Sequence, residues 1–356
     1  MKKLLTFFFA LALQSWIIAQ IPNGYYNPAN GLSGEDLQQA LHNIIDNHNA
    51  VSYSSLWDHF EQTDKKSNGK VWDMYSDIPG GTPPYQFTFG SDQCGNYSGE
   101  GDCFNREHSF PKSWFGGEVA PMNSDLFHLC PTDGYVNGKR SNYAFGEVGS
   151  ASWTSLNGSK LGNCVAPGYS GTVFEPIDGY KGDFARNYFY MATRYYGEDN
   201  NWPGSEMTNG AEPKTWALNM LYLWHQQDPV SAKETARNNA VYQIQDNRNP
   251  FIDHPEYVGS IWFSTGVGID DVADRTDFSV FPNPMKDWVF INTSSEINNQ
   301  AITINISDEA GRLVYSAVEN SNHQIKVNVS EFSNGFYFLT LYAGNSNPPV
   351  TFKLVK

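Results

Sequence analysis

Basic residues are scarce in this sequence. Lysine and arginine number 23 against 38 aspartates and glutamates, and the formal net charge is −15. Tight binding of a polyanion normally needs a basic surface, which this composition excludes for the chain as a whole. Any contact with a polyanion must therefore rest on a small local group of cations, and we expect it to be weak and transient.

Long apolar runs are also missing, except at the N-terminus. That segment reads MKKLLTFFFALALQSWIIAQ, with Lys2 and Lys3 before the apolar run Leu4–Leu13. The run is short and is followed by Gln14, which is typical of a secretory signal peptide rather than a membrane span. We therefore predict a signal peptide over residues 1–19 and an exported protein. An N-terminal membrane anchor is the alternative.

Cysteines number only four: Cys94, Cys103, Cys130 and Cys164. An even count in an exported chain favours disulfides, and four cysteines allow three pairings. We expect Cys94–Cys103, which are close in sequence, and Cys130–Cys164. A zinc site is the rival interpretation, but CxxC and histidine-rich spacings are absent. HExxH is absent too, which counts against a zinc hydrolase acting on peptides or esters.

The chain has enough apolar sequence for a substantial core. Its 356 residues are 40% apolar and 15% aromatic, which suits one large domain or two of moderate size. Apolar periodicity predicts helices over Gly34–His48, Ser54–Thr63, Trp216–His225 and Ser231–Ile244. A short strand is expected over Lys70–Tyr75. Another helix is expected to bury the face formed by Phe184, Tyr188, Met191 and Tyr195.

The segment Cys103–Phe145 carries most of the chemistry. We expect a strand over Cys103–His108, and helices over Pro121–His128 and Pro131–Asn142. The second of these helices contains two glycines, so the fold rather than local propensity must hold it. It should face the strand.

Hard oxygens, a histidine and cations gather in this segment. The carboxylate of Glu107 and the carboxamide of Asn137 are ligands that suit Mg²⁺. A neutral His108 can take a proton from water, and Lys139 and Arg140 can hold a phosphate. Together these groups suggest metal-assisted hydrolysis of phosphodiesters.

Four sequence motifs resemble those of the endonuclease I family of secreted, non-specific bacterial nucleases, which are built on a ββα-metal site. They are NREHSFPKSWF, DLFHLCPTDGYVNGKRSN, GDFARNYFYMATRYY and NRNPFIDHPEY, in a resemblance that extends from Trp72 to Tyr257. It implies an α+β fold, a mixed helical nuclease domain with a ββα-metal core. It also implies cleavage of DNA, and of RNA as well, to 5′-phosphate products without sequence specificity.

The resemblance also implies roles for single residues. Glu107 and Asn137 would bind the metal, Mg²⁺ or another divalent cation such as Mn²⁺ or Ca²⁺, and His108 would be the general base. From the chemistry of its side chain, Arg140 is expected to be catalytic by clamping the scissile phosphate, since the guanidinium can make two hydrogen bonds to phosphate oxygens. Arg106, Lys139 and Asn142 would bind substrate, although Asn142 is also a rival metal ligand or a helix cap.

Two further points concern the same site. Neighbouring strand residues point to opposite faces, so Glu107 and His108 share one site only if the strand bends or the metal lies near its edge. Asp125 and His128 resemble residues that orient the site, although Asp125 could equally be a structural cap. Asn123 stands where some relatives carry an acidic residue, and an arginine-bearing insertion found in some relatives is absent.

From Phe278 onward the sequence alternates apolar and polar residues between turns. This pattern predicts a small β-sandwich. FPNP, DEAGR and NGFYFLTL resemble the sorting domain of type IX secretion, which implies export or cell-surface attachment. The alternative is a generic sandwich, such as a carbohydrate binder, but no aromatic platform is evident in the sequence.

The predicted organisation is a signal peptide over 1–19, a catalytic domain over 20–264, a linker over 265–277 and a sorting domain over 278–356. We expect a monomer that is exported through the periplasm and is secreted or held at the cell surface. Its partners would be nucleic acid and the type IX secretion machinery. A non-enzymatic surface-binding protein is the main alternative function.

Overall fold

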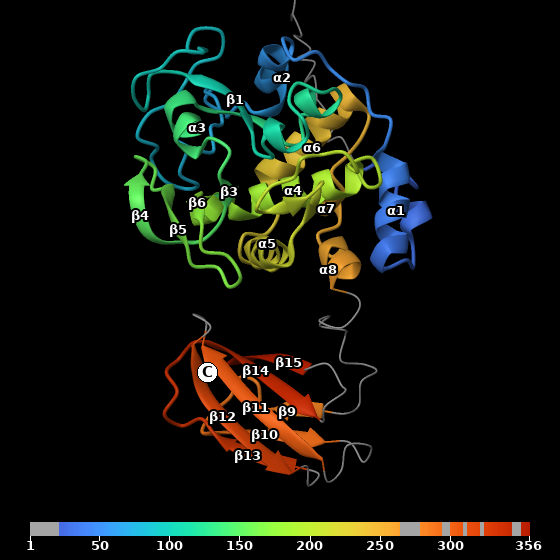
Figure 1. Cartoon of the computed structure of the whole chain (residues 1–356), viewed down its shortest axis with the longest axis vertical. Helices are drawn as coiled ribbons and strands as arrows, with labels where there is room; N and C mark the ends of the chain where they lie inside the picture. The colour runs from blue at the N-terminus through green and yellow to red at the C-terminus, as the bar shows by residue number, and fades with distance from the viewer. Residues whose placement is uncertain (1–20, 264–277, 294–299, 309–311, 321–323, 344–349) are drawn as a thin grey trace, which may run out of the picture. The chain divides into compact units, whose positions relative to one another are not determined.

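The computed structural model describes residues 21–263, 278–293, 300–308, 312–320, 324–343 and 350–356. Residues 36–257 form most of one compact unit and residues 258–356 most of another (Figure 1). The predicted signal peptide and linker lie outside the described residues. Within the described ranges, no helix has both the length and the apolar character needed to cross a membrane.

The larger unit is organised around helix α4 (Lys181–Arg194), of which 13 of 14 residues are buried. The predicted apolar face of Phe184, Tyr188, Met191 and Tyr195 is confirmed, since all four side chains are fully buried. Aromatic side chains this large account for much of the core area. Further helices of this unit are α1 (Gly34–Ile45), α2 (Leu56–Thr63), α5 (Thr215–Gln227), α6 (Ala232–Gln245) and α7 (Pro250–Asp253), and α8 (Tyr257–Trp262) begins at the point in the chain where the two units divide.

A four-stranded sheet lies in the same unit, in the order β3-β6-β5-β4 (Figure 1). Its strands are β3 (Ala144–Phe145), β4 (Val148–Thr154), β5 (Lys160–Cys164) and β6 (Thr172–Glu175). β3 and β6 are parallel and the other pairs are antiparallel. A short hairpin joins β7 (Thr208–Asn209) to β8 (Glu212–Pro213).

The segment with the candidate site forms an antiparallel strand pair followed by a helix. These are β1 (Phe104–His108), β2 (Leu129–Asp133) and α3 (Gly134–Arg140). Asp133 ends the strand and caps the helix, because its Oδ1 accepts a hydrogen bond of 2.8 Å from the Val136 amide. The strand-to-helix arrangement that the resemblance implied is therefore present.

Three predicted elements in the larger unit differ from the structure. Residues 121–128 contain only a 3-10 turn, Met122–Ser124. The helix expected from Pro131 begins at Gly134, because Pro131 pairs with Arg106 in the two-stranded sheet, where an edge position tolerates proline. The strand expected over Lys70–Tyr75 is reduced to isolated bridges.

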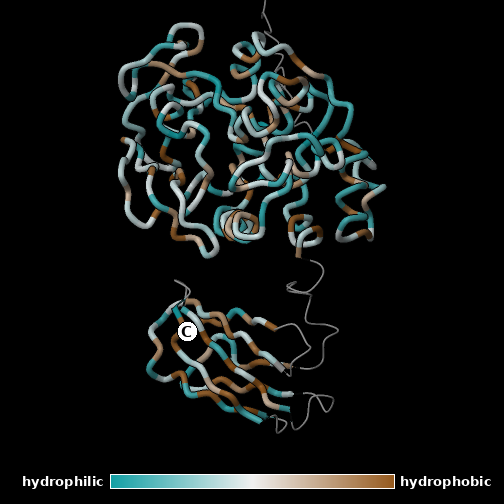
Figure 2. Tube along the Cα trace, in the orientation of Figure 1, coloured by the Kyte–Doolittle hydropathy of each residue, from teal (hydrophilic) through white to brown (hydrophobic). Residues whose placement is uncertain are grey.

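The smaller unit is a β-sandwich, as predicted. One sheet has the order β13-β10-β9 and the other β12-β11-β14-β15. The strands are β9 (Phe278–Phe281), β10 (Trp288–Thr293), β11 (Ala301–Asp308), β12 (Leu313–Asn320), β13 (Gln324–Asn328), β14 (Phe336–Ala343) and β15 (Val350–Val355). Alternate residues, such as Ile302, Ile304 and Ile306 on β11, point into a shared apolar core. Figure 2 shows hydrophobic and hydrophilic positions following one another along the strands of this unit.

One expectation about this sandwich needs correction. No aromatic platform was evident in the sequence, yet β14 exposes Phe336, Phe338 and Tyr342 on one face, each 37–46% accessible. The strand period of two explains the row, since Tyr337, Leu339 and Leu341 between them point into the core.

Candidate active site

The β1 strand turns Asn105 and Glu107 toward helix α3. The Asn137 Nδ2 donates to Asn105 Oδ1 at 2.7 Å, and Arg140 Nη1 lies 3.1 Å from Glu107 Oε1. Residues three apart on a helix and two apart on a strand each share one face, so the two elements align in register. The expectation that Asn137 lies on a helix facing the strand is confirmed.

The Glu107 carboxylate is buried, with 2% of the residue exposed. The Tyr75 hydroxyl donates to Oε1 at 2.8 Å. Burial raises the pKa of Glu107 to about 7, and the nearby Arg140 and the Tyr75 hydrogen bond oppose that rise. Oε1 is therefore held by two protein groups, while Oε2 makes no hydrogen bond to any described residue.

The Arg140 guanidinium faces the protein interior and is only 1% exposed. Besides Glu107, it donates to the backbone oxygens of His108 at 2.9 Å and Ser109 at 2.6 Å, and to the Tyr188 hydroxyl at 3.4 Å. These contacts leave no exposed edge of the guanidinium for a phosphate. Its position suits a group that fixes Glu107 and the end of β1.

The His108 ring lies on the opposite face of β1. Its Nε2 lies 3.2 Å from the Asn123 backbone oxygen, which can only accept, so Nε2 carries the hydrogen and Nδ1 carries the lone pair. Burial lowers the pKa of His108 to about 3, with a further contribution from His128. The ring is therefore neutral near pH 7, as a proton acceptor must be.

The structure does not bring all the predicted site residues into contact with one another. Among the described residues no hydrogen bond links the His108 ring to the Glu107 carboxylate. Arg106 is half-buried, donates to the Tyr53 backbone oxygen at 2.8 Å and lies 3.8 Å above the Tyr53 ring. Lys139 lies 5.1 Å from the centre of the Tyr135 ring. Asn142 is exposed just beyond α3, beside a cavity of about 550 Å³.

Asp125 is fully buried, and its Oδ1 accepts a local hydrogen bond of 3.1 Å from the Phe127 amide, as a structural capping residue would. Its Oδ2 accepts hydrogen bonds of 2.9 Å from the hydroxyls of Tyr190 and Tyr195, and its Oδ1 accepts one of 3.1 Å from Gln245. Burial raises its pKa, but charged and hydrogen-bonding neighbours outweigh it, so the pKa is lowered overall. His128 lies 5.5 Å from the His108 ring, centre to centre.

Tyr97 explains the two glycines of α3. A Cβ on Gly138 would lie 2.6 Å from the Tyr97 hydroxyl oxygen, and one on Gly134 would lie 2.7 Å from the ring. The Tyr97 ring can pack against α3 only because these two positions carry no side chain. This packing holds the helix, although glycine lowers its intrinsic helix propensity.

One predicted disulfide is present and the other is not. Cys94–Cys103 is formed. The predicted Cys130–Cys164 bond is wrong, because both thiols are free and buried. Cys130 pairs with Glu107 across β1 and β2, whereas Cys164 ends β5 in a different sheet and accepts a hydrogen bond from the Ala166 amide. The even number of cysteines in the sequence could not reveal that Cys130 and Cys164 lie in different sheets.

Two residues of the site were missed by the sequence analysis. Asn105 lies two residues before Glu107, so strand alternation alone could have placed it on the same face. Tyr75 is 32 residues from its partner Glu107, and no local pattern in the sequence pointed to it.

Comparison with known proteins identifies both units. The family model described as Endonuclease I matches residues 33–256, and the one described as a secretion system C-terminal sorting domain matches residues 279–356. These matches cover most of the two compact units.

Individual relatives agree with the family match. An extracellular ribonuclease of Bacillus amyloliquefaciens is 39% identical over 249 residues, which cover 67% of this chain and 78% of that protein. An extracellular ribonuclease of Bacillus subtilis (strain 168) is 37% identical over 251 residues, with the same coverage of 67% and 78%. A periplasmic deoxyribonuclease of Aeromonas hydrophila is 28% identical over 138 residues, covering 38% and 50%. The chain therefore belongs to the endonuclease I family, and it is a secreted endonuclease with a C-terminal sorting domain.

Proposed function

We propose that this endonuclease hydrolyses both DNA and RNA, without sequence specificity, at a single divalent-cation site on β1 and α3. The observation that carries the proposal is the position of Glu107 and Asn137, each with one hard oxygen that no described residue occupies. Relatives named as ribonucleases and as a deoxyribonuclease support both substrates.

The donor set fits Mg²⁺, or Mn²⁺ or Ca²⁺ in its place. One carboxylate and one carboxamide oxygen leave other coordination positions for water and phosphate, as Mg²⁺ prefers. Asn137 donates its amide hydrogen to Asn105, which turns its own oxygen away from that contact. When bound, the cation would supply charge neutralisation at the phosphate and at the leaving 3′-oxygen.

His108 is the proposed general base, which requires the cation and the phosphate to lie near the edge of β1, since the His108 ring and the Glu107 carboxylate lie on opposite faces of the strand. Its Nε2–H is engaged by the Asn123 backbone oxygen, so Nδ1 is the atom that takes the proton from water. Attack by that water in line with the 3′-oxygen leaves 5′-phosphate and 3′-hydroxyl ends. Because Arg140 is buried, we assign it the task of holding Glu107 and the β1 backbone. The half-exposed Arg106 and Lys139 are the proposed substrate cations.

The sandwich is proposed to act as a type IX sorting domain that the secretion machinery recognises and binds. Its match over residues 279–356 supports this role. Domain limits of 20–264 and 278–356, with a linker over 265–277, and the monomeric state are parts of the same proposal.

The function is tested by incubating the purified mature protein with plasmid DNA and with RNA, with Mg²⁺ or with excess chelator. We expect both substrates to be degraded only with the cation, and the products to accept ligation through their 5′-phosphates. Undiminished cleavage in chelator would exclude the metal site. Plasmid and RNA that both stay intact would favour a zinc hydrolase or a non-enzymatic binding protein, and loss of only one of them would restrict the proposal to that substrate.

A further inference from the structure

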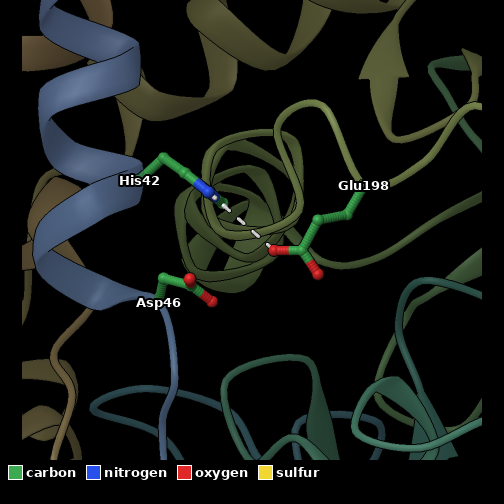
Figure 3. A group of neighbouring side chains, drawn as sticks. All are labelled: His42, Asp46 and Glu198. Atoms are coloured by element: carbon green, nitrogen blue, oxygen red, sulfur yellow. Dashed lines mark ion pairs between the residues drawn. The ribbon is translucent and has the colours of Figure 1, made fainter.

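A second group of ligand-type side chains lies outside the proposed catalytic site. His42 and Asp46 are four residues apart, at the C-terminal end of α1 and just beyond it, and Glu198 follows the end of α4. One ligand atom from each of the three lies within 4.8 Å of the others. Figure 3 shows the three side chains converging from the two segments.

The His42 ring is held in one tautomer. Its Nδ1 lies 3.2 Å from the Thr193 backbone oxygen and 3.0 Å from that of Arg194. Carbonyl oxygens only accept, so Nδ1 carries the hydrogen and Nε2 of the neutral ring is a bare lone pair. This is the arrangement of a metal-binding histidine, whose second nitrogen typically donates to a carbonyl or carboxylate.

The bare nitrogen points at another acceptor. Nε2 of His42 lies 3.9 Å from Glu198 Oε1. A lone pair facing a carboxylate oxygen is unfavourable unless a cation, either a proton or a metal ion, lies between them. The His42 side chain is only 11% exposed, so bulk water screens this contact poorly.

The charges around the cluster leave room for a cation. Arg194 Nη1 lies 3.1 Å from Asp46 Oδ1 and 2.9 Å from Glu198 Oε1. One guanidinium faces two carboxylates, so the group keeps one negative charge when His42 is neutral. Glu198 Oε2 makes no hydrogen bond to any described residue, and the Glu198 side chain is 44% exposed, which gives an ion access from solvent.

We propose that His42, Asp46 and Glu198 bind one Zn²⁺ ion, with water completing the coordination. One imidazole nitrogen beside two carboxylates favours a transition-metal cation, whereas Mg²⁺ and Ca²⁺ prefer oxygen ligands alone. The Asn47 amide and side chain donate to Asp46 Oδ1 at 2.6 Å and Oδ2 at 2.8 Å. The ion therefore displaces part of the contacts that Arg194 and Asn47 make with the carboxylates, and it cross-links α1 to the segment after α4. It stabilises the fold and takes no part in hydrolysis.

The test uses the full chain, stripped of metal and titrated with Zn²⁺ in a calorimeter, with Tm recorded at each step. The variants are His42→Gln and Glu198→Gln. The matched control is His254→Gln, since His254 pairs with Glu256 at 2.9 Å but belongs to no such three-residue group in the described part of the chain. Zinc that enters the catalytic site is common to all four proteins and cancels in the comparison.

We expect the wild type and His254→Gln to bind one equivalent of Zn²⁺ more than His42→Gln and Glu198→Gln, or to bind it at least about tenfold more tightly. Their Tm should rise with Zn²⁺ by more than that of the two variants. Equal zinc uptake and equal Tm shifts in the wild type and in a folded Glu198→Gln protein would overturn the proposal. A wild type that takes up no additional zinc would overturn it as well.

Discussion

Single charged residues inside the larger unit are neutralised by specific partners. Arg237 donates to Asp64 at 2.8 Å, and Arg186 donates to Glu234 through two nitrogens. Removing one partner of such a pair leaves a buried charge uncompensated, and this costs far more than the intact pair contributes. The same reasoning applies to Arg140 and Glu107 at the site, so neither residue can be replaced as a simple surface charge.

His225 is the residue whose titration should be visible in stability. Its Nδ1 faces Arg186 Nη1 at 3.2 Å and its Nε2 faces the Pro255 backbone oxygen at 3.0 Å. Burial, reinforced by the Arg186 charge, lowers the pKa of His225 from 6.5 to about 4. Because the folded-state pKa is the lower one, the unfolded chain binds the proton more readily. The stabilisation from neutral His225 is therefore present above pH 6.5 and is lost as the pH falls toward 4.

The expected loss is roughly 3 kcal/mol over that pH range. Urea unfolding of the wild type and of His225→Gln, measured at several pH values, isolates this contribution from that of the carboxylates. The free energy of unfolding should fall more steeply with decreasing pH in the wild type. Parallel curves for the two proteins would contradict the assignment.

At the level of elements, the packing of α4 on α5 depends on a glycine. A Cβ on Gly182 would lie 2.0 Å from the Asp228 backbone oxygen at the end of α5, and the Gly182 amide donates to the Asp228 carboxylate at 2.9 Å. A backbone atom cannot move aside as a side-chain tip can. The central helix therefore needs a residue without a side chain at this point.

Gly182→Ala should therefore destabilise the protein by roughly 3 kcal/mol, despite the better helix propensity of alanine. Asn219→Ala, at an exposed position of α5, is the control, and a change of only a few tenths of a kcal/mol is expected there. Thermal unfolding of both variants decides the point. A Gly182→Ala protein as stable as the control would mean that the two helices can separate without loss.

Elements with a regular apolar period could be predicted from the sequence. The core face of α4 and the strands of the sandwich follow this rule, because burial of one face imposes the pattern. The helix prediction for residues 121–128 was wrong because buried polar contacts hold that segment, and such contacts produce no apolar periodicity in the sequence. The resemblance suggested Glu107 and Asn137 as metal ligands, and this role stays a proposal. The burial of Arg140 depends on polar contacts that produce no such periodicity, so it could not be predicted from the sequence.

At the scale of the whole molecule, the two units have separate cores. The apolar cluster of the sandwich draws only on residues from Phe278 onward, whereas α4 and its neighbours form the core of the larger unit. A domain with its own core can in principle fold alone. The chain divides most compactly after Tyr257, somewhat before the predicted domain end at residue 264.

Removal of residues 265–356 should leave nuclease activity intact while abolishing correct export. Activity per folded molecule, with folding checked by circular dichroism, is the first measurement, and the distribution of protein between cells and medium is the second. A truncated protein that is folded yet inactive would show that the catalytic unit needs the sandwich.

The central claim is that Glu107 and Asn137 hold the cation while His108 accepts the proton. Mg²⁺ titration calorimetry on the wild type, His108→Ala, Glu107→Gln and Asn137→Ala, with cleavage rates for each, tests it most directly. We predict that His108→Ala keeps its Mg²⁺ affinity but cleaves about two to four orders of magnitude more slowly. The other two variants should bind Mg²⁺ weakly and recover part of their rate in excess Mg²⁺. Loss of Mg²⁺ binding in His108→Ala, or unchanged binding in Glu107→Gln, would contradict the account.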